Sequence, residues 1–295
     1  MKELDTAKLY ERLHNLTVRN SDNGNRFIDT SRLDKIEQEL KETRYEFCHK
    51  GKLFHAYAQL PFEELPKNLI VISSHVDFKN STHKCFSDET NQEYVIGTYD
   101  NSITNAAIVT LMKECMFPFE VVVVFTGDEE EDQGGASEFS DFLNDTLKAN
   151  VRCIVLDVTE SAANIGADFT IENDCWERDW GRKILKWANK CEMKWRYVPY
   201  EKSRLKDETI KELVDFEHRE DEIADIDETE TYYEDNDISC FSFCLPVELM
   251  DREGKHAPWD EAMHSDDGLR VRRVTFENYI YALWQVIWVT TEGRW

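Results

Sequence analysis

The sequence predicts an α/β fold built on a mainly parallel β-sheet. Three short segments consist almost entirely of apolar residues, at 69–72, 121–125 and 153–156. Continuous apolar runs of this length are typical of strands that are buried on both faces of a sheet. Helical patterns at 102–116 and 135–148 lie between these runs. Strands that alternate with helices indicate βα units, and therefore parallel neighbours.

The other elements follow from periodicity and turn residues. An apolar stripe predicts a helix over residues 3–18, and capping residues at 29–31 predict a second helix that runs to about residue 43. A hairpin over 45–60 is expected to turn at Lys50 and Gly51. Further along the chain we expect a helix from Trp176 to about residue 190, strands over 193–200 and 238–247, and a C-terminal helix over 276–289.

Composition narrows the class of protein. The 295 residues are 41% hydrophobic, which suffices for one large domain or for two small ones. The net charge of −25 repels nucleic acid and anionic membrane surfaces, so neither is expected as a partner. The charged N-terminus lacks the apolar core of a secretory signal, and no apolar run approaches the ~20 residues that span a bilayer. The eight cysteines form no C-x-x-C pair, which argues against a disulfide framework and for a reducing cytoplasm.

One segment differs from the rest in composition. Residues 201–237 are dominated by charge, mainly acidic, with few apolar positions. A solvated surface insertion is the simplest interpretation of such a segment. A lid over a site and a contact between copies of the chain remain open as alternatives.

Residues able to bind a metal lie at the boundaries of two of the predicted elements. His75 comes just after the run at 69–72, and Asp77 lies two residues later, where a carboxylate can orient the imidazole through its second nitrogen. Asp100 precedes the helix at 102–116, where it can cap the helix or bridge two cations. Taken singly, each of them is explained as simply by an ordinary hydrogen bond or by capping.

Three further candidates lie at later boundaries. Five consecutive acidic residues at 128–132 follow a buried strand, and a cation would relieve their repulsion, although a solvated acidic loop is equally simple. Asp157 ends another buried strand, where an unpaired carboxylate is costly. His264 precedes the last helix and by itself is typical of a surface histidine. Because ligand sites in open α/β sheets form at the carboxyl ends of the strands, we expect these side chains to converge.

The ordered set of motifs is more specific than its members. The order His-x-Asp, Gly-x-x-Asp-Asn, Thr-x-x-Glu-Glu, Asp-Val-Thr and His-Ser resembles the co-catalytic di-zinc exopeptidase superfamily, over roughly residues 69–292. That superfamily includes leucyl, glutamyl and deblocking aminopeptidases, and related carboxypeptidases and deacylases. The resemblance implies a single-domain, three-layer αβα fold with a mixed, mainly parallel central sheet (zinc-dependent exopeptidase, phosphorylase/hydrolase-like). The domain would span 1–295, with an acidic insertion at about 201–237.

The resemblance also implies a ligand set for two divalent metal ions. His75 and Asp157 would hold one ion, Glu130 and His264 would hold the other, and Asp100 would bridge them. Zinc is the expected metal, and cobalt and manganese suit the same mixture of histidine and carboxylate ligands.

The remaining roles concern orientation and proton transfer. The resemblance implies that Asp77 orients the first histidine and that Glu129 is the general base. The consecutive glutamates leave the register open, and two anchors favour this one. Thr126 lies three residues before Glu129, and Gly135-Ala136 lies where relatives close the motif.

Some positions depart from the pattern of the relatives, and they concern pocket shape. Asp132 stands where relatives usually carry glycine, and Thr104-Asn105 follow the Asp-Asn pair where many carry glycine. Several aromatic side chains can either line a pocket or pack in the core, and core packing is the simpler role. They are Phe169, Trp176, Phe241 and Phe243.

The function implied is that of a metallo-aminopeptidase acting on peptide or aminoacyl substrates. Glu129 would take a proton from a metal-bridged water and later deliver it to the leaving amine. Alternatives are a carboxypeptidase or N-acyl amino acid deacylase on the same scaffold, and a non-catalytic metal-binding homologue. Homo-oligomers remain open. His264 is preferred to His256 and His218 as the last ligand, because it alone has the Met-His-Ser setting before a helix.

Overall fold

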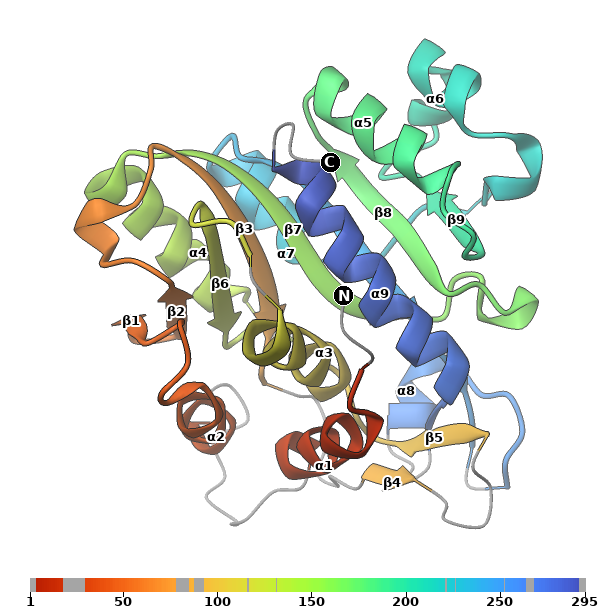
Figure 1. The fold of residues 1–295 in the computed structure, drawn as a ribbon. Coiled ribbons are helices and arrows are strands. Elements are labelled where there is room, and N and C mark those ends of the chain that lie inside the picture. The colour runs from red at the N-terminus through yellow and green to blue at the C-terminus, as the bar shows by residue number, and fades with distance from the viewer. Residues whose placement is uncertain are drawn as a thin grey trace.

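An eight-stranded sheet runs through the centre of the molecule (Figure 1). The computed structural model describes residues 4–17, 30–77, 85–87, 93–115, 117–130, 132–220, 222–225, 227–251, 253–263 and 268–291. In spatial order the strands are β1 (Phe47–Lys50), β2 (Phe54–Ala58), β6 (Val121–Thr126), β3 (Asn68–His75), β7 (Asn150–Thr159), β10 (Ser239–Pro246), β8 (Phe169–Cys175) and β9 (Trp195–Val198).

The sheet is mixed, and its centre is parallel. The pairs β6–β3, β3–β7 and β7–β10 are parallel, and so is the edge pair β8–β9. The pairs β1–β2, β2–β6 and β10–β8 are antiparallel. The hairpin predicted over 45–60 is the antiparallel pair β1 and β2. The three apolar runs expected as core strands are β3, β6 and β7, and the strand expected over 238–247 is β10, so the predicted fold class is confirmed.

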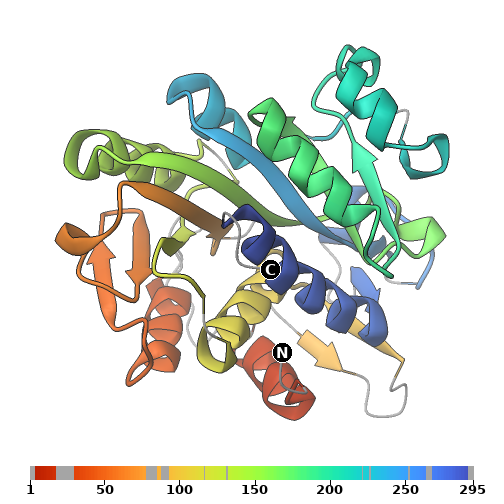
Figure 2. The same ribbon diagram turned by 45° about the horizontal axis from the view of Figure 1, so that its top comes forward.

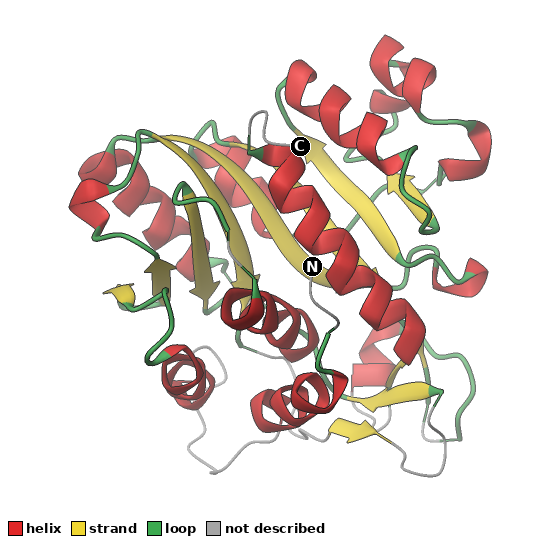
Figure 3. Cartoon of the chain, viewed as in Figure 1, coloured by secondary structure: helices red, strands yellow, loops and turns green. Residues whose placement is uncertain are grey.

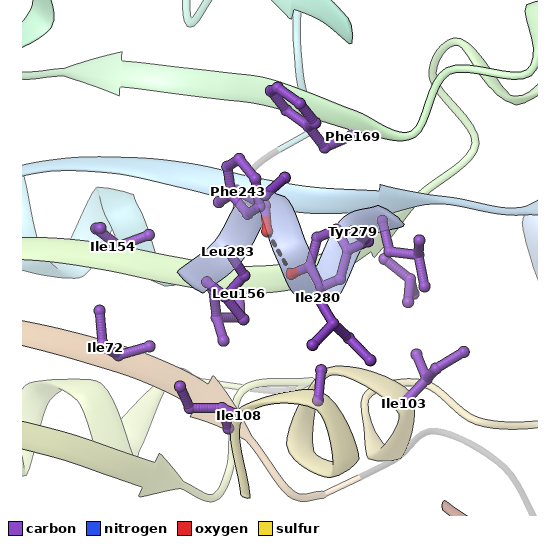
Figure 4. Close-up of a cluster of buried hydrophobic side chains, with 14 of the residues drawn as sticks. Ile72, Ile103, Ile108, Ile154, Leu156, Phe169, Phe243, Tyr279, Ile280 and Leu283 are labelled. Carbon is purple, nitrogen blue, oxygen red and sulfur yellow. Dashed lines mark hydrogen bonds between the residues drawn. The ribbon is translucent and has the colours of Figure 1, made fainter. Parts of the chain in front are cut away.

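Alternation along the buried strands produces a core on each face of the sheet. Ile70 and Ile72 of β3 point into the larger core, whereas Leu69 and Val71 point into the smaller one. Figure 4 shows part of the larger core, where Ile72, Ile154 and Leu156 meet side chains from helices. The hydroxyl of Tyr279 donates a hydrogen bond to the carbonyl of Phe243 there, at 2.9 Å. The strands are mainly apolar because neither face meets water.

Helices cover both faces and complete three layers (Figures 1 to 3). The larger core lies under α1 (Thr6–Thr17), α2 (Thr30–Leu40), α3 (Ser102–Glu114), α5 (Arg178–Ala188) and α9 (Arg273–Thr290). The opposite face is covered by α4 (Gly134–Asp141), the π-helical η2 (Phe142–Leu147), α7 (Glu228–Glu230) and the π-helical η6 (Thr231–Asp235). None of the described helices combines the length and apolarity that a bilayer-crossing segment needs. The cysteines whose side chains are described are all free thiols.

Two parts of the sheet structure were not predicted. Strand β8 contains Glu172 and Asp174, which weaken a sequence signal for a strand, yet all of its residues are buried. A second, four-stranded sheet lies below the first in Figure 1. It consists of β11 (Glu248–Leu249), β12 (Leu269–Arg272), β5 (Tyr94–Gly97) and β4 (Cys85–Ser87), and the short α8 (Trp259–Met263) precedes β12 in the chain. These strands have two to four residues, too few for a periodic pattern.

The acidic segment 201–237 folds in two different ways. Its first part forms η4 (Arg204–Lys206), α6 (Glu208–Leu213) and η5 (Phe216–His218), and the side chain of Phe216 is 83% exposed. The last part packs against the main sheet, where Asp227, Glu228 and Tyr232 are buried. Ile210 and Val214 of the first part are buried in the larger core, so a solvated insertion describes only some residues of that part. The last part is buried where Ser73 and Ser242 of the sheet donate hydrogen bonds to the carboxylates of Glu228 and Asp227.

Candidate metal centre

Several of the predicted site residues converge at the carboxyl ends of β3 and β7. His75 is the last residue of β3, and Asp157 lies near the end of the neighbouring β7. The Nε2 atom of His75 lies 3.3 Å from Oδ1 of Asp100 and 3.5 Å from Oδ1 of Asp157. Ligand atoms of these three residues all lie within 4.8 Å of one another, so a single cation can contact all of them.

A second group shares the same histidine. Ligand atoms of His75, Glu129 and Glu130 also lie within 4.8 Å of one another, and His75 Nε2 is 4.0 Å from Oε2 of Glu129. Both glutamates are in the loop that follows β6, the parallel neighbour of β3. The acidic run thus reaches the same point as Asp100 and Asp157. His264 lies outside the described residues.

Polar side chains of α3 hold the surrounding backbone in place. Asn105 Nδ2 donates to the carbonyl of His75 at 2.8 Å, and Asn101 Nδ2 donates to the carbonyl of Leu156 at 2.6 Å. The hydroxyls of Thr104 and Ser74 are 2.9 Å apart. The peptide bond that precedes Asn101 is cis. The pair Thr104-Asn105, a departure from the pattern of the relatives, therefore ties the first turn of α3 to the end of β3, and Asn101 ties the start of the helix to β7.

Asp77 connects the histidine to the glutamate loop. Its Oδ1 lies 3.5 Å from Nδ1 of His75, on the side of the ring away from Asp100 and Asp157, and neither atom has another hydrogen-bond partner. Its Oδ2 accepts a hydrogen bond from the backbone N–H of Glu130 at 3.2 Å. The carboxylate is fully buried, so it lies where the predicted orienting group would act.

The electrostatics of this cluster favour a cation. Burial and the charge of Asp100 raise the pKa of Glu130 to about 8, and burial raises the pKa of Asp157 to about 6. Burial also raises the pKa of Glu129 well above its ordinary value. Burial opposes protonation of His75, but the carboxylates around it, Glu129 first, raise the pKa of its imidazole. These pKa shifts arise because several carboxylates lie close together in a site that is shielded from water.

The residues present fit divalent metal ions. One histidine and several carboxylates are the ligand types that zinc, cobalt and manganese accept. Oδ1 of Asp100 is buried without a hydrogen-bond partner, although a buried carboxylate oxygen ordinarily has one. A cation bound to this oxygen would satisfy it.

A cavity of about 310 Å³ opens beside these residues. Part of its wall comes from residues that no sequence motif predicts. Glu172 belongs to the strand β8 that was not predicted, Asp227 belongs to the acidic segment, and Cys244 and Trp259 also line the cavity. No local signal marks these residues, because they reach the cavity through the order of the strands and through the burial of the acidic segment.

The rival histidines and the aromatic candidates lie elsewhere. His218 stacks on Trp195 at a ring distance of 4.7 Å, and His256 is exposed and forms an isolated bridge with Met250. Neither is among the residues that line the cavity. The four aromatic candidates also do not line it. Phe169, Phe241 and Phe243 are fully buried in the larger core and Trp176 packs against that core, so the core interpretation is confirmed.

Gly135 makes the loop of Glu129 and Glu130 possible. Its N–H donates to the carbonyl of Gly127 at 2.9 Å, and a Cβ at this position would lie 2.5 Å from that carbonyl and 2.8 Å from the carbonyl of Leu53. An added Cβ would clash with backbone atoms, which cannot move aside as a flexible side chain can, so the loop itself would have to shift.

We expect Gly135→Ala to lower the free energy of unfolding by about 1–3 kcal/mol and to weaken divalent metal binding. Thermal melts and metal titration would measure both effects. Ser137→Ala, on the exposed side of the same helix, should change neither. A Gly135→Ala protein with unaltered melting temperature and metal affinity would contradict the role given to this contact.

Comparison with known proteins shows the fold. No family model and no curated protein matches the chain. Among solved structures, the aminopeptidase APDkam598 from the archaeon Desulfurococcus kamchatkensis is similar, with a TM-score of 0.61 and 8% identity over 97% of this chain and 96% of its own. A tripeptidase from Staphylococcus aureus has a TM-score of 0.58 and 11% identity, over 98% and 100%. PhTET1-12s, described as a dodecamer, has a TM-score of 0.60 and 11% identity, over 92% and 97%.

These similarities assign the chain to a class of fold. They cover nearly the whole of this chain and of each similar chain, so the three-layer fold is shared from end to end. The fold implied by the motif resemblance is thereby confirmed. At 8–11% identity the likeness extends to the fold alone.

Proposed function

We propose that residues 1–295 form one catalytic domain, a two-metal aminopeptidase that removes N-terminal residues from peptides. The observation that carries this proposal is the convergence of His75, Asp100 and Asp157 with Glu129 and Glu130 at one end of the sheet, beside a cavity. An aminopeptidase and a tripeptidase with the same fold support this choice among hydrolases.

In this proposal each site residue has one task. His75 and Asp157 would hold one divalent ion, Glu130 and His264 would hold the other, and Asp100 would contribute to both. Zinc is the first expectation, with cobalt or manganese as alternatives. Bound there, the ions would lower the pKa of a shared water and stabilise negative charge that develops on the substrate carbonyl.

Glu129 is the proposed general base. Oε2 of its carboxylate lies 4.0 Å from Nε2 of His75. The carboxylate is not one of the proposed metal ligands, so it remains free to transfer a proton. The carboxylate would accept a proton from the attacking water and hand it to the leaving amine. Its burial supports this role, because a carboxylate with a raised pKa is a better base near neutral pH.

A substrate panel tests the reaction class. Protein reconstituted with zinc, cobalt or manganese would be offered aminoacyl amides and, separately, N-acetylated amino acids and peptides with a blocked N-terminus. We expect turnover of the aminoacyl amides alone. Turnover of blocked substrates alone would replace the aminopeptidase with a deacylase or carboxypeptidase, and no turnover with full metal occupancy would favour a non-catalytic homologue. Because PhTET1-12s is described as a dodecamer, light scattering should accompany the assay.

The fifth ligand can be tested by metal content. We expect His264→Ala to retain fewer than two ions per chain, because one of the proposed centres would lose its histidine. Inductively coupled plasma mass spectrometry after dialysis measures this stoichiometry. The control is His256→Ala, since His256 is exposed and does not line the cavity. Unchanged stoichiometry in His264→Ala with loss in His256→Ala would transfer the role to His256.

A further inference from the structure

The cavity wall carries more negative charge than the proposed metals balance. Eight acidic residues line it, and four of them have tasks at the metal centre, which leaves four. The four assigned carboxylates match the four positive charges of two divalent ions. Among the described residues that line the cavity there is no lysine or arginine. The four unassigned residues are Glu160, Glu172, Asp225 and Asp227.

Strand register places two of these carboxylates next to the metal centre. Cys244 of β10 lies opposite Asp157 of β7, and two residues earlier Ser242 lies opposite Glu172 of β8. Residues two apart in a strand share a face, so Glu172 is on the same face as Asp157, two strands along the sheet with β10 between them. The hydroxyl of Ser242 also donates a hydrogen bond to Oδ2 of Asp227. Glu172 and Asp227 therefore flank Ser242 at the end of the cavity beyond Asp157.

Both carboxylates are buried, and neither pairs with a described lysine or arginine. Glu172 is 4% exposed and Asp227 is 7% exposed. Thr170 donates a hydrogen bond to Glu172 at 2.6 Å, and the backbone of Thr229 donates one to Asp227 at 2.8 Å. Burying carboxylates without a cation is unfavourable, so their environment is more stable when a positive group enters the cavity.

The end of this cavity at the metal centre also contains an unsatisfied buried oxygen. Oδ1 of Asp100, in a residue that is only 9% exposed, lines the same space without a hydrogen-bond partner. At the rim, Glu160 and Asp225 are exposed and extend the negative potential outward. A cavity with such an acidic wall and rim attracts cations and repels acidic substrates.

We propose that the cavity selects substrates whose N-terminal residue has a cationic side chain, lysine or arginine, and that Glu172 and Asp227 receive the ammonium or guanidinium group. This inference rests on the proposed function, because the peptide bond of such a residue must lie at the metal centre. The two carboxylates lie beyond Asp157, so a long side chain is needed to reach them.

Pairs of substrates with side chains of similar length isolate the effect of the side-chain charge. Lysine and norleucine amides have similar stems, as do arginine and citrulline amides, and only the first of each pair is cationic. For the metal-loaded protein we expect kcat/KM to favour the cationic member by about tenfold to a hundredfold, the range for a hydrogen bond to a charged group. Glu172→Gln and Asp227→Asn should each lower this ratio. Glu63→Gln removes the same charge from an exposed position in η1 (Phe62–Glu64), away from the cavity, and should keep it.

Direct binding separates the two proposals. Thermal shifts with lysine amide and norleucine amide report binding even when no bond is cleaved. Hydrolysis without preference for the cationic member would overturn the specificity and leave the peptidase proposal intact. No hydrolysis, but a larger shift with lysine amide that Glu172→Gln abolishes, would leave the cation site and remove the peptidase function. If Glu172→Gln instead lost a bound metal ion, the carboxylate would be a metal ligand and the specificity proposal would be wrong.

Discussion

Glu129→Gln is expected to lower kcat by about 10²- to 10⁴-fold while the protein keeps its metal ions and its melting temperature. Glutamine has the shape of glutamate but cannot accept the proton, and general base catalysis accounts for a factor of this size. The carboxylate has no ligand role in the proposed centre, so its loss leaves the ions in place. Steady-state kinetics on an aminoacyl amide, with metal content measured on the same sample, checks both halves of the expectation.

The neighbouring residue supplies the control. Glu130→Gln should lose affinity for metal, because Glu130 is a proposed ligand and an amide oxygen is a weaker donor than a carboxylate. The pair of variants therefore tests the register of the consecutive glutamates. If Glu130→Gln kept its metal and lost only turnover, while Glu129→Gln lost metal, the two roles would have to be exchanged.

The second large effect concerns the stability of the metal-free protein. Glu228 is 1% exposed, Ser73 donates a hydrogen bond to its Oε2 at 2.6 Å, and its Oε1 has no partner. Burial raises the pKa of this carboxyl from 4.5 to about 7. The folded protein therefore binds more protons than the unfolded chain between these values. Stability must fall as the pH rises from about 4.5 to about 7, and the loss is complete above that range.

We expect Glu228→Gln to be more stable than the unaltered protein at pH 8, by up to about 3 kcal/mol for a shift of this size. The difference should shrink toward pH 5, where the unaltered carboxyl is protonated. Urea unfolding in the presence of a chelator, at pH values from 5 to 8, measures it. Glu63→Gln, which is exposed, should keep the pH dependence of the unaltered protein. An equally steep dependence in Glu228→Gln would show that other buried carboxylates dominate.

Much of the fold follows from local pattern. The runs at 69–72, 121–125 and 153–156 are the strands β3, β6 and β7, because a short run that is apolar on both sides is typical of a strand in the middle of a covered sheet. The helices expected at 102–116, after Trp176 and over 276–289 are α3, α5 and α9. The order of short motifs also identified residues that meet in space, namely His75, Asp100, Asp157 and the two glutamates.

Other features depend on contacts between distant segments. Strand β8 was missed because Glu172 and Asp174 interrupt its apolar pattern. Glu172 is buried beside the cavity, and Asp174 is buried against Arg204, which donates a hydrogen bond to it. The end of the acidic segment was expected in solvent, but Ser73 and Ser242 on the sheet bind Glu228 and Asp227.

The sequence by itself determined the class of fold and the core strands, and its motifs predicted residues of the candidate centre. Only the tertiary structure decided what surrounds that centre, since the acidic wall is assembled from β8, from the acidic segment and from the loops beyond β7. The physical reason is that periodicity records which face of an element meets water, whereas the partner of a buried carboxylate is set by which strands become neighbours.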